Sequence, residues 1–100
     1  YIIQSLDKKL SINDIATAKG LSLDELLKEM EEIVESGTRL NLSHIILEMI
    51  DEEEREDIHD FFKETENFSF DEARIQYEED VFNDDEIRLL RIDFISQVAN

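Results

Sequence analysis

Residues 10–26 read LSINDIATAKGLSLDEL, and this stretch contains two helix-start signals with Gly20 between them. In each signal a serine, Ser11 or Ser22, can accept a hydrogen bond from the backbone three residues on, where an acid can bond back to the serine N–H. The leucine before each serine can pack on an apolar residue of the helix that follows. A short helix, a glycine turn and a longer amphipathic helix are typical of a helix-turn-helix.

The helical spacing of apolar residues predicts three helices in this part of the chain, at about residues 1–9, 12–19 and 23–36. Gly20 is expected in the left-handed conformation that ends the second helix, and Gly37 is expected to end the third. The regular apolar stripe of the third helix indicates that it faces a core. The predicted inner faces are Ile2, Ile3 and Leu6 in the first helix, Ile12, Ile15 and Ala16 in the second, and Leu23, Leu26, Leu27, Met30, Ile33 and Val34 in the third.

The rest of the chain also has a helical pattern. Residues 38–42 alternate polar and apolar side chains, which indicates a linker or a short extended crossing, and Ser43 starts a further helix. Because proline is absent and only two glycines occur, the predicted fold is all-α, with a helix-turn-helix N-terminal half packed on, or followed by, an acidic helical bundle. Three more helices are marked by Ile58, Phe61 and Phe62, by a capping signal at residues 68–72, and by a second one at 82–87, whose helix has the inner face Ile87, Leu90, Phe94, Ile95 and Val98.

Charge divides the chain unevenly. Residues 1–44 carry five Lys/Arg and eight Asp/Glu, whereas residues 45–100 carry five and nineteen, and the whole chain has a formal net charge of −17. We therefore predict a helix-turn-helix at 1–44 and an acidic helical bundle at 45–100, joined in one compact unit. Such a field repels free DNA and anionic membranes, so the expected partners are basic protein surfaces, or DNA held mainly by other parts of a longer chain.

Two further features bound the kind of protein. Cysteine is absent, which excludes disulfides and thiolate chemistry and is compatible with a reducing compartment. No apolar stretch is long enough to span a bilayer. Because the chain begins at Tyr1 without a methionine, we expect it to be a fragment of a longer protein.

No catalytic residue is predicted, and the fragment is not expected to be an enzyme. The isolated glycines do not form a phosphate-binding loop, so ATP hydrolysis by that route is excluded. The serines stand mostly at helix starts, where capping explains them. His44 and His59 are the only imidazoles, and neither has a triad-like setting in the sequence.

No metal site and no cofactor are predicted in the fragment either. Glu56-x-x-His59 has the spacing of a di-iron ligand pair, but a di-iron bundle needs two such pairs, and only one is present. His44 and Glu48 share a predicted helix face. We expect all of these side chains to belong to solvated acidic surfaces.

The third helix has the position of a DNA-reading helix but the wrong charge for one. Lys28 is its only base, against six acids, and carboxylates beside DNA phosphates are strongly unfavourable. Other bases flank the motif and can touch the DNA backbone from its edges. The candidate DNA contacts are Lys8, Lys9, Lys19, Lys28 and Arg39.

Three blocks of the sequence resemble a known family. They are GLSLDELL at residues 20–27, SGTRLNL at 36–42 and the closing segment at 86–100, which begins EIRLLRI. Together they resemble the C-terminal helix-turn-helix region of bacterial RecQ-type ATP-dependent DNA helicases, notably those of the Bacteroides group. The resemblance covers most of the chain, and the first two blocks are its more specific parts.

The resemblance implies a parent enzyme that unwinds DNA 3′ to 5′ in repair and recombination, with ATP, magnesium and zinc bound outside this fragment, in the bacterial cytoplasm at the nucleoid. This fragment is then a non-catalytic accessory domain that gives weak DNA placement, protein docking or regulation. The alternative is a free-standing helix-turn-helix adaptor or transcription-regulator domain that binds a basic protein partner. The oligomeric state stays open.

Overall fold

A computed structural model describes residues 1–65 and 68–98. Over these residues the chain is all-helical and contains no strand, which confirms the predicted fold class. Residues 99–100, the last two of the closing block, lie outside this range. The helices are α1 (Ile2–Asp7), α2 (Ile12–Lys19), α3 (Leu23–Glu35), α4 (Ser43–Met49), α5 (Glu52–Glu64), α6 (Phe70–Gln76) and α7 (Asp84–Val98).

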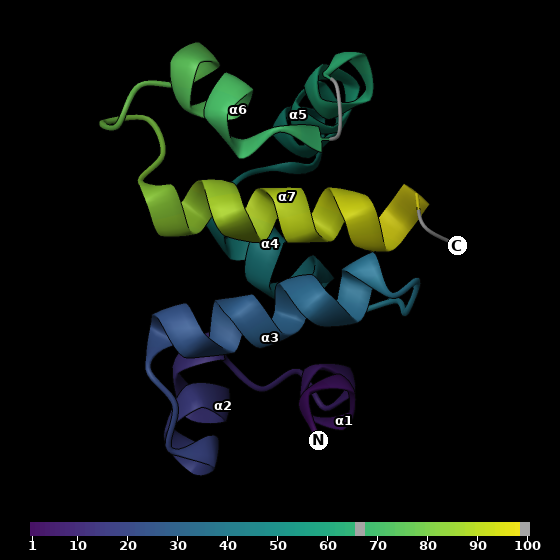
Figure 1. Cartoon of the computed structure of the whole chain (residues 1–100), viewed down its shortest axis with the longest axis vertical. Coiled ribbons are helices and arrows are strands. Elements are labelled where there is room, and N and C mark those ends of the chain that lie inside the picture. The colour runs from purple at the N-terminus through teal and green to yellow at the C-terminus, as the bar shows by residue number, and fades with distance from the viewer. Residues whose placement is uncertain (66–67, 99–100) are drawn as a thin grey trace.

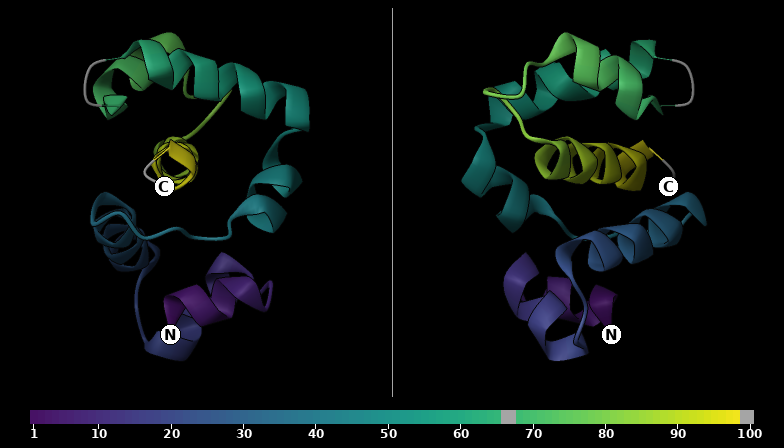
Figure 2. Two further views of the ribbon diagram at one scale, coloured as in Figure 1. Left: turned by 90° about the vertical axis from the view of Figure 1, so that its right-hand side faces the viewer. Right: turned by 60° about the vertical axis from the view of Figure 1, so that its left-hand side comes forward.

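The last helix, α7, lies at the centre of the fold. It packs most extensively along α3 and also contacts α4, α5 and α6 (Figure 1). Seen end-on in the left panel of Figure 2, α7 is surrounded by these helices, while α1 and α2 lie on the far side of α3. The division of the chain into domains at residue 44 stays a prediction, and α7 contacts helices on both sides of that boundary.

The inner face predicted for α7 is too narrow and is wrong at one position. Ile87, Leu90, Phe94 and Ile95 are buried as expected, but so are Leu89 and Ile92, because α7 has neighbours on several sides. Val98, by contrast, is 46% exposed. It lies in the last turn, where it borders an open cleft beside α5.

The helix-turn-helix forms where the sequence places it. α2 has the predicted ends, and Gly20 ends it with φ +68°, the left-handed conformation. α3 ends one residue earlier than predicted, and Gly37 follows with φ +95°. α1 ends at Asp7, because Lys9 adopts a left-handed φ of 63° and turns the chain. The predicted inner-face residue Ile3 is 39% exposed.

Residues 38–42 form the extended crossing that the alternating pattern predicts, with no strand. Leu40 and Leu42 are buried in the core. The backbone of Leu40 is held by Ser96 of α7, whose Oγ accepts from Leu40 N–H at 2.8 Å and donates to Leu40 C=O at 3.0 Å. This crossing carries the chain from α3 to α4 past the end of α7 (Figure 2).

Capping explains where the acidic helices begin. Asp51 and Glu54 form a reciprocal capping box at α5, and Asn83 and Glu86 exchange the same pair of bonds before α7. At α6, Ser69 Oγ accepts from the backbone N–H three residues on. Inside this half, rings pack edge-on or stacked with centroids 5.0–5.6 Å apart, among them Phe61, Phe62, Phe68, Tyr77, Phe82 and Phe94.

Candidate nucleic-acid interface

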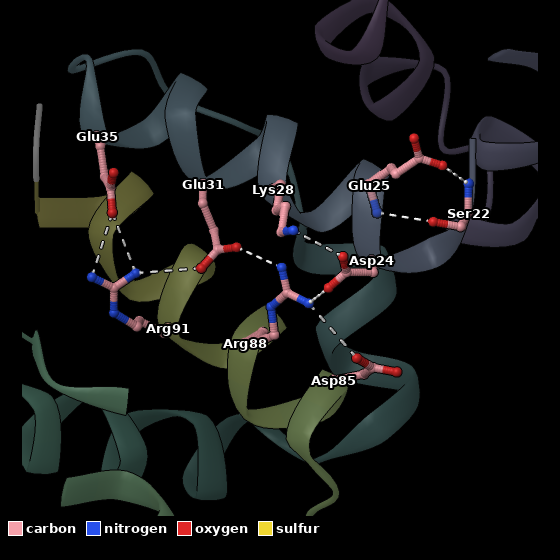
Figure 3. Close-up of polar contacts among 9 residues, drawn as sticks. All are labelled: Ser22, Asp24, Glu25, Lys28, Glu31, Glu35, Asp85, Arg88 and Arg91. Atoms are coloured by element: carbon pink, nitrogen blue, oxygen red, sulfur yellow. Dashed lines mark hydrogen bonds and ion pairs between the residues drawn. The ribbon is translucent and has the colours of Figure 1, made fainter. Parts of the chain in front are cut away.

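The start of α3 is fixed by its capping box. Ser22 Oγ accepts from Glu25 N–H at 3.2 Å, and Glu25 Oε1 accepts from Ser22 N–H at 3.0 Å (Figure 3). These bonds to Ser22 lower the pKa of the Glu25 carboxyl. Because the apolar stripe of α3 is buried, its remaining faces carry the acids that the sequence shows.

One acidic flank of α3 is neutralised by α7. Arg88 Nη1 donates to Asp24 Oδ1 and Arg88 Nη2 donates to Glu31 Oε1, each at 2.7 Å (Figure 3). One turn further along α7, Arg91 lies 3.8 Å from Glu31 and 3.5 Å from Glu35. Two arginines of α7 therefore bind three carboxylates of α3 along the line where the helices pack.

These ion pairs change the electrostatics of both partners. The hydrogen bonds from Arg88 and then from Lys28 hold the pKa of Asp24 below its usual range. For Arg88, burial works against its charge, but bonds to Glu31 and Asp24 outweigh it and raise the pKa of the guanidinium. The prediction of a repulsive recognition helix is therefore too simple, since part of its negative charge is already paired.

Two of the five candidate DNA contacts form ion pairs with acids of the same chain. Lys28 Nζ lies 3.2 Å from Asp24 Oδ2, so this only base of α3 binds the carboxylate that Arg88 also binds. Lys19 Nζ lies 3.9 Å from Glu29 Oε2 and 5.7 Å from the centre of the Tyr1 ring. Both lysines therefore have an acidic partner within the chain.

The other three candidates, Lys8, Lys9 and Arg39, are exposed and form no ion pair within the described ranges 1–65 and 68–98. Lys8 and Lys9 follow α1. Arg39 lies in the crossing after α3 and lines a cleft together with Asp7, the last residue of α1. In the left panel of Figure 2 this crossing runs between α3 and α4, above α1. In the helix-turn-helix the cations without an ion pair thus lie after α1 and in the crossing after α3, and not on α3.

A buried charge network joins α4, α5 and α7. Asp93 is buried and accepts from Arg55 Nε at 2.9 Å, from Arg55 Nη2 at 2.7 Å and from His59 Nε2 at 2.9 Å. Arg55 Nη1 also reaches Ser43 Oγ at 3.3 Å. Burial would raise the pKa of Asp93, but the bonds from His59 and Arg55 outweigh burial and lower it.

This network corrects the interpretation of His59 as part of a solvated acidic face. His59 is largely buried, and its ring also packs edge-on against Phe94. Glu56, its partner in the Glu-x-x-His spacing, is exposed. His44 is likewise partly buried, and its Nε2 donates to Leu10 C=O at 3.0 Å.

Within the described part of the chain, no group of three or more His, Asp or Glu side chains is arranged to hold a metal ion. No helix there is both long and apolar enough to cross a membrane. Each described histidine forms a hydrogen bond through Nε2, whereas the buried Nδ1 of His44 has no hydrogen-bond partner among the described residues.

The sequence analysis did not predict two sets of ion pairs. In one, arginines of α7 bind acids of α3, and in the other, Arg55 binds Asp93. The partners are 57 and 64 residues apart for Arg88, and 38 apart for Arg55. One signal was present in the sequence: Arg88 and Arg91 are three residues apart, which places them on one helix face.

Comparison with known families identifies the N-terminal part. Residues 1–46 match the family described as RecQ-1-like, helix-turn-helix domain. The match begins at α1 and ends within α4, and it confirms the resemblance of this region to RecQ-type helicases. A helix-turn-helix domain of this kind is a non-catalytic part of those enzymes. No curated protein matches the chain.

Proposed function

We propose that this chain is a non-catalytic accessory domain of a RecQ-type 3′–5′ DNA helicase that acts in DNA repair and recombination. It touches the DNA backbone weakly through Lys8, Lys9 and Arg39, and α3 does not read bases. The match of residues 1–46 supports the helicase setting. The observation that carries the mode of contact is the packing of α3 against α7, with Arg88 and Arg91 on its acidic flank.

The geometry favours edge contact over groove reading for a physical reason. A recognition helix must bring base-contacting side chains to the groove while bases around it neutralise phosphates. α3 instead lies between α7 on one side and α1 and α2 on the other (Figure 1). Its exposed side chains are mostly acids, and Lys28 is paired with Asp24. Among the described residues, a phosphate meets positive charge without an ion pair only at Lys8, Lys9 and Arg39, which we call the edge cations.

The ATP, magnesium and zinc of such an enzyme belong, in this proposal, to other parts of a longer chain. The described residues fit none of them, because they hold no metal-binding group of three acidic or histidine side chains and no glycine-rich phosphate loop. The chain's own contribution is therefore positioning.

Fluorescence anisotropy with a labelled, 3′-tailed duplex tests this contact. At about 20 mM salt we expect the 100-residue chain to bind with a Kd weaker than about 1 µM, and log Kd to rise with log salt with a slope of about 2–3, as for three phosphate contacts. The triple variant Lys8→Gln, Lys9→Gln, Arg39→Gln should lose this binding and its salt dependence.

A matched triple variant separates specific contact from net charge. Lys19→Gln, Lys28→Gln, Lys63→Gln removes the same charge from lysines that are already ion-paired, so it should retain most of the binding. Binding much tighter than 1 µM, or equal loss in the two triple variants, would contradict the edge-contact proposal. A tight dimer in sedimentation that does not bind DNA would favour the adaptor alternative.

The accessory role has its own test in a full-length protein that carries this domain. The edge triple variant should raise the DNA concentration needed for half-maximal ATP hydrolysis and leave kcat unchanged, because no residue of this chain takes part in chemistry. A fall in kcat at saturating DNA would show a catalytic contribution and overturn the proposal.

A further inference from the structure

Two branched aliphatic side chains are exposed on α6 and the turn that follows it. Ile75 is 84% exposed, the largest fraction among the large hydrophobic side chains described as exposed, and Val81 is 56% exposed. Single exposed aliphatics are ordinary on protein surfaces. Two of them within seven residues, on a segment that is otherwise strongly polar, need a physical reason.

The segment that carries them is linked by hydrogen bonds from one arginine. Arg74 Nη2 donates to the carbonyl oxygens of Tyr77 at 2.7 Å and Phe82 at 2.6 Å, and Arg74 Nη1 donates to Asp84 at 2.7 Å. The rings of Tyr77 and Phe82 pack edge-on with centroids 5.5 Å apart. One guanidinium therefore links the turn and the start of α7 to α6, and Ile75 and Val81 directly adjoin Arg74 and Phe82 of this network in the sequence.

The surroundings of these two side chains are acidic. Exposed carboxylates flank them, and none of these forms an ion pair in the part of the chain that the structure describes. Arg74, the only base in the segment, is directed to Asp84 and to backbone carbonyls. The flanking carboxylates are Asp71, Glu72, Glu78, Glu79 and Asp80.

The outer face of α5 provides an internal comparison. It is also acidic, with Glu53, Glu56 and Asp57 exposed, but no large hydrophobic side chain in residues 52–64 is exposed. The outer surface of α5 is therefore acidic but exposes no large aliphatic side chain. At α6 the chain combines the same charge with two uncovered aliphatic side chains.

We propose that residues 71–81 form a docking surface for a basic segment of another protein, in which Lys or Arg side chains flank aliphatic ones. The aliphatic side chains of the partner cover Ile75 and Val81, and its bases meet the five carboxylates. A second copy of the chain does not fit, because it would bring the same negative surface and a net charge of −17. The surface shares no residue with Lys8, Lys9 and Arg39. This proposal can therefore be tested independently of the proposed DNA contact.

Two synthetic peptides of equal length and charge serve as probes. One is an 18-residue amphipathic Leu/Lys peptide, and the other has every leucine replaced by serine. Titration of the ¹⁵N-labelled chain by NMR should show the Leu/Lys peptide shifting amides of residues 68–84, with an affinity about tenfold higher than that of the Ser/Lys peptide. Shifts centred on α5, or equal affinities for the peptides, would refute the proposal.

Paired variants separate the apolar contribution from the electrostatic one. Ile75→Ser/Val81→Ser should abolish the preference for the Leu/Lys peptide, whereas Leu47→Ser/Val98→Ser, which removes two other exposed aliphatics, should keep it. Glu72→Gln/Glu79→Gln should lower the affinity for both peptides more than Glu53→Gln/Glu56→Gln on α5 does. If each control behaves like its test variant, binding is non-specific attraction and the surface is not a docking site. Concentration-dependent dimerisation lost in Ile75→Ser/Val81→Ser would assign the surface to a second copy instead.

Discussion

Arg88 of α7 donates to Asp24 in the first turn of α3 over 2.7 Å, across 64 residues of sequence. The same guanidinium donates to Glu31 on the next turns of α3. In a helix-turn-helix that reads DNA, the N-terminal residues of the second helix contact base edges. Here Arg88, from another helix of the same chain, binds a carboxylate in that first turn.

Replacing Arg88 by glutamine should destabilise the fold by about 1 kcal/mol, because the largely buried guanidinium loses its bonds to Asp24 and Glu31, each of which keeps one weaker cationic partner. Urea unfolding followed by circular dichroism measures this change. The control is Lys63→Gln, since Lys63 and its partner Asp60 are both mostly exposed, and it should change stability by less than about 0.5 kcal/mol. Equal effects of the two substitutions would mean that the ion pairs between α3 and α7 contribute no more to stability than an exposed pair does.

The Arg55–Asp93 pair should show strong coupling. Asp93→Asn leaves a buried guanidinium without its counter-charge, and Arg55→Met leaves a buried carboxylate with only His59, so each should cost about 3–5 kcal/mol. The double variant should cost much less than the sum, because no charge is then left alone. A double-mutant cycle from urea unfolding gives the coupling, and additive costs would show that the two residues act independently.

The contribution of Asp93 to stability should depend on pH with a defined sign. Its pKa is lowered in the folded state, so its contribution is complete above the ordinary value of 3.8 and is lost as the pH falls through the folded value. Asp93→Asn does not titrate at this position. The gap in unfolding free energy between the wild type and Asp93→Asn should therefore shrink as the pH falls below about 4. A gap that widens below about pH 4 would show that the pKa of Asp93 is raised.

Gly20 is the position where the turn depends on backbone conformation. A Cβ added there meets no atom within 4 Å, so a substitution acts through φ, which is +68°. Gly20→Ala should cost about 1 kcal/mol in thermal unfolding. A chain synthesised with D-alanine at residue 20 should be at least as stable as the wild type, since D-residues favour positive φ and restrict the unfolded chain. Equal loss with both enantiomers would point to a steric cause.

The helix boundaries were predictable because the signals that set them are local. Ser22 and Glu25 are three residues apart, and Gly20 ends α2 by its own conformational freedom. Burial of α7 was harder to foresee. Its sequence mixes apolar residues with Arg88, Asp93 and Ser96, and a polar residue in a helix normally indicates a solvent face. In this fold Asp93 and Ser96 are buried because partners on other elements satisfy them.

For the candidate DNA contacts, too, the sequence predicts the residue types but not their ion pairs. All five bases were identifiable by type, but their availability depends on neighbours that sequence distance hides. Lys28 and Asp24 are four residues apart on one helix, so their ion pair could be predicted from the sequence. Lys19 and Glu29 belong to different helices, and the freedom of Arg39 depends on how the crossing after α3 lies against α1. These are properties of the packing.

The hydrogen bonds between Ser96 and Leu40 also bear on the order of folding. Ser96 lies near the end of α7, and α7 leaves the ribosome after the other six described helices. Until it arrives, the backbone of residue 40, the acidic flank of α3 and the inner sides of α4, α5 and α6 all lack their main partner. Packing of these segments during synthesis must therefore wait for α7, and they emerge as nascent chain in which apolar surface is transiently exposed. Their high negative charge helps to keep such intermediates apart in the crowded cell.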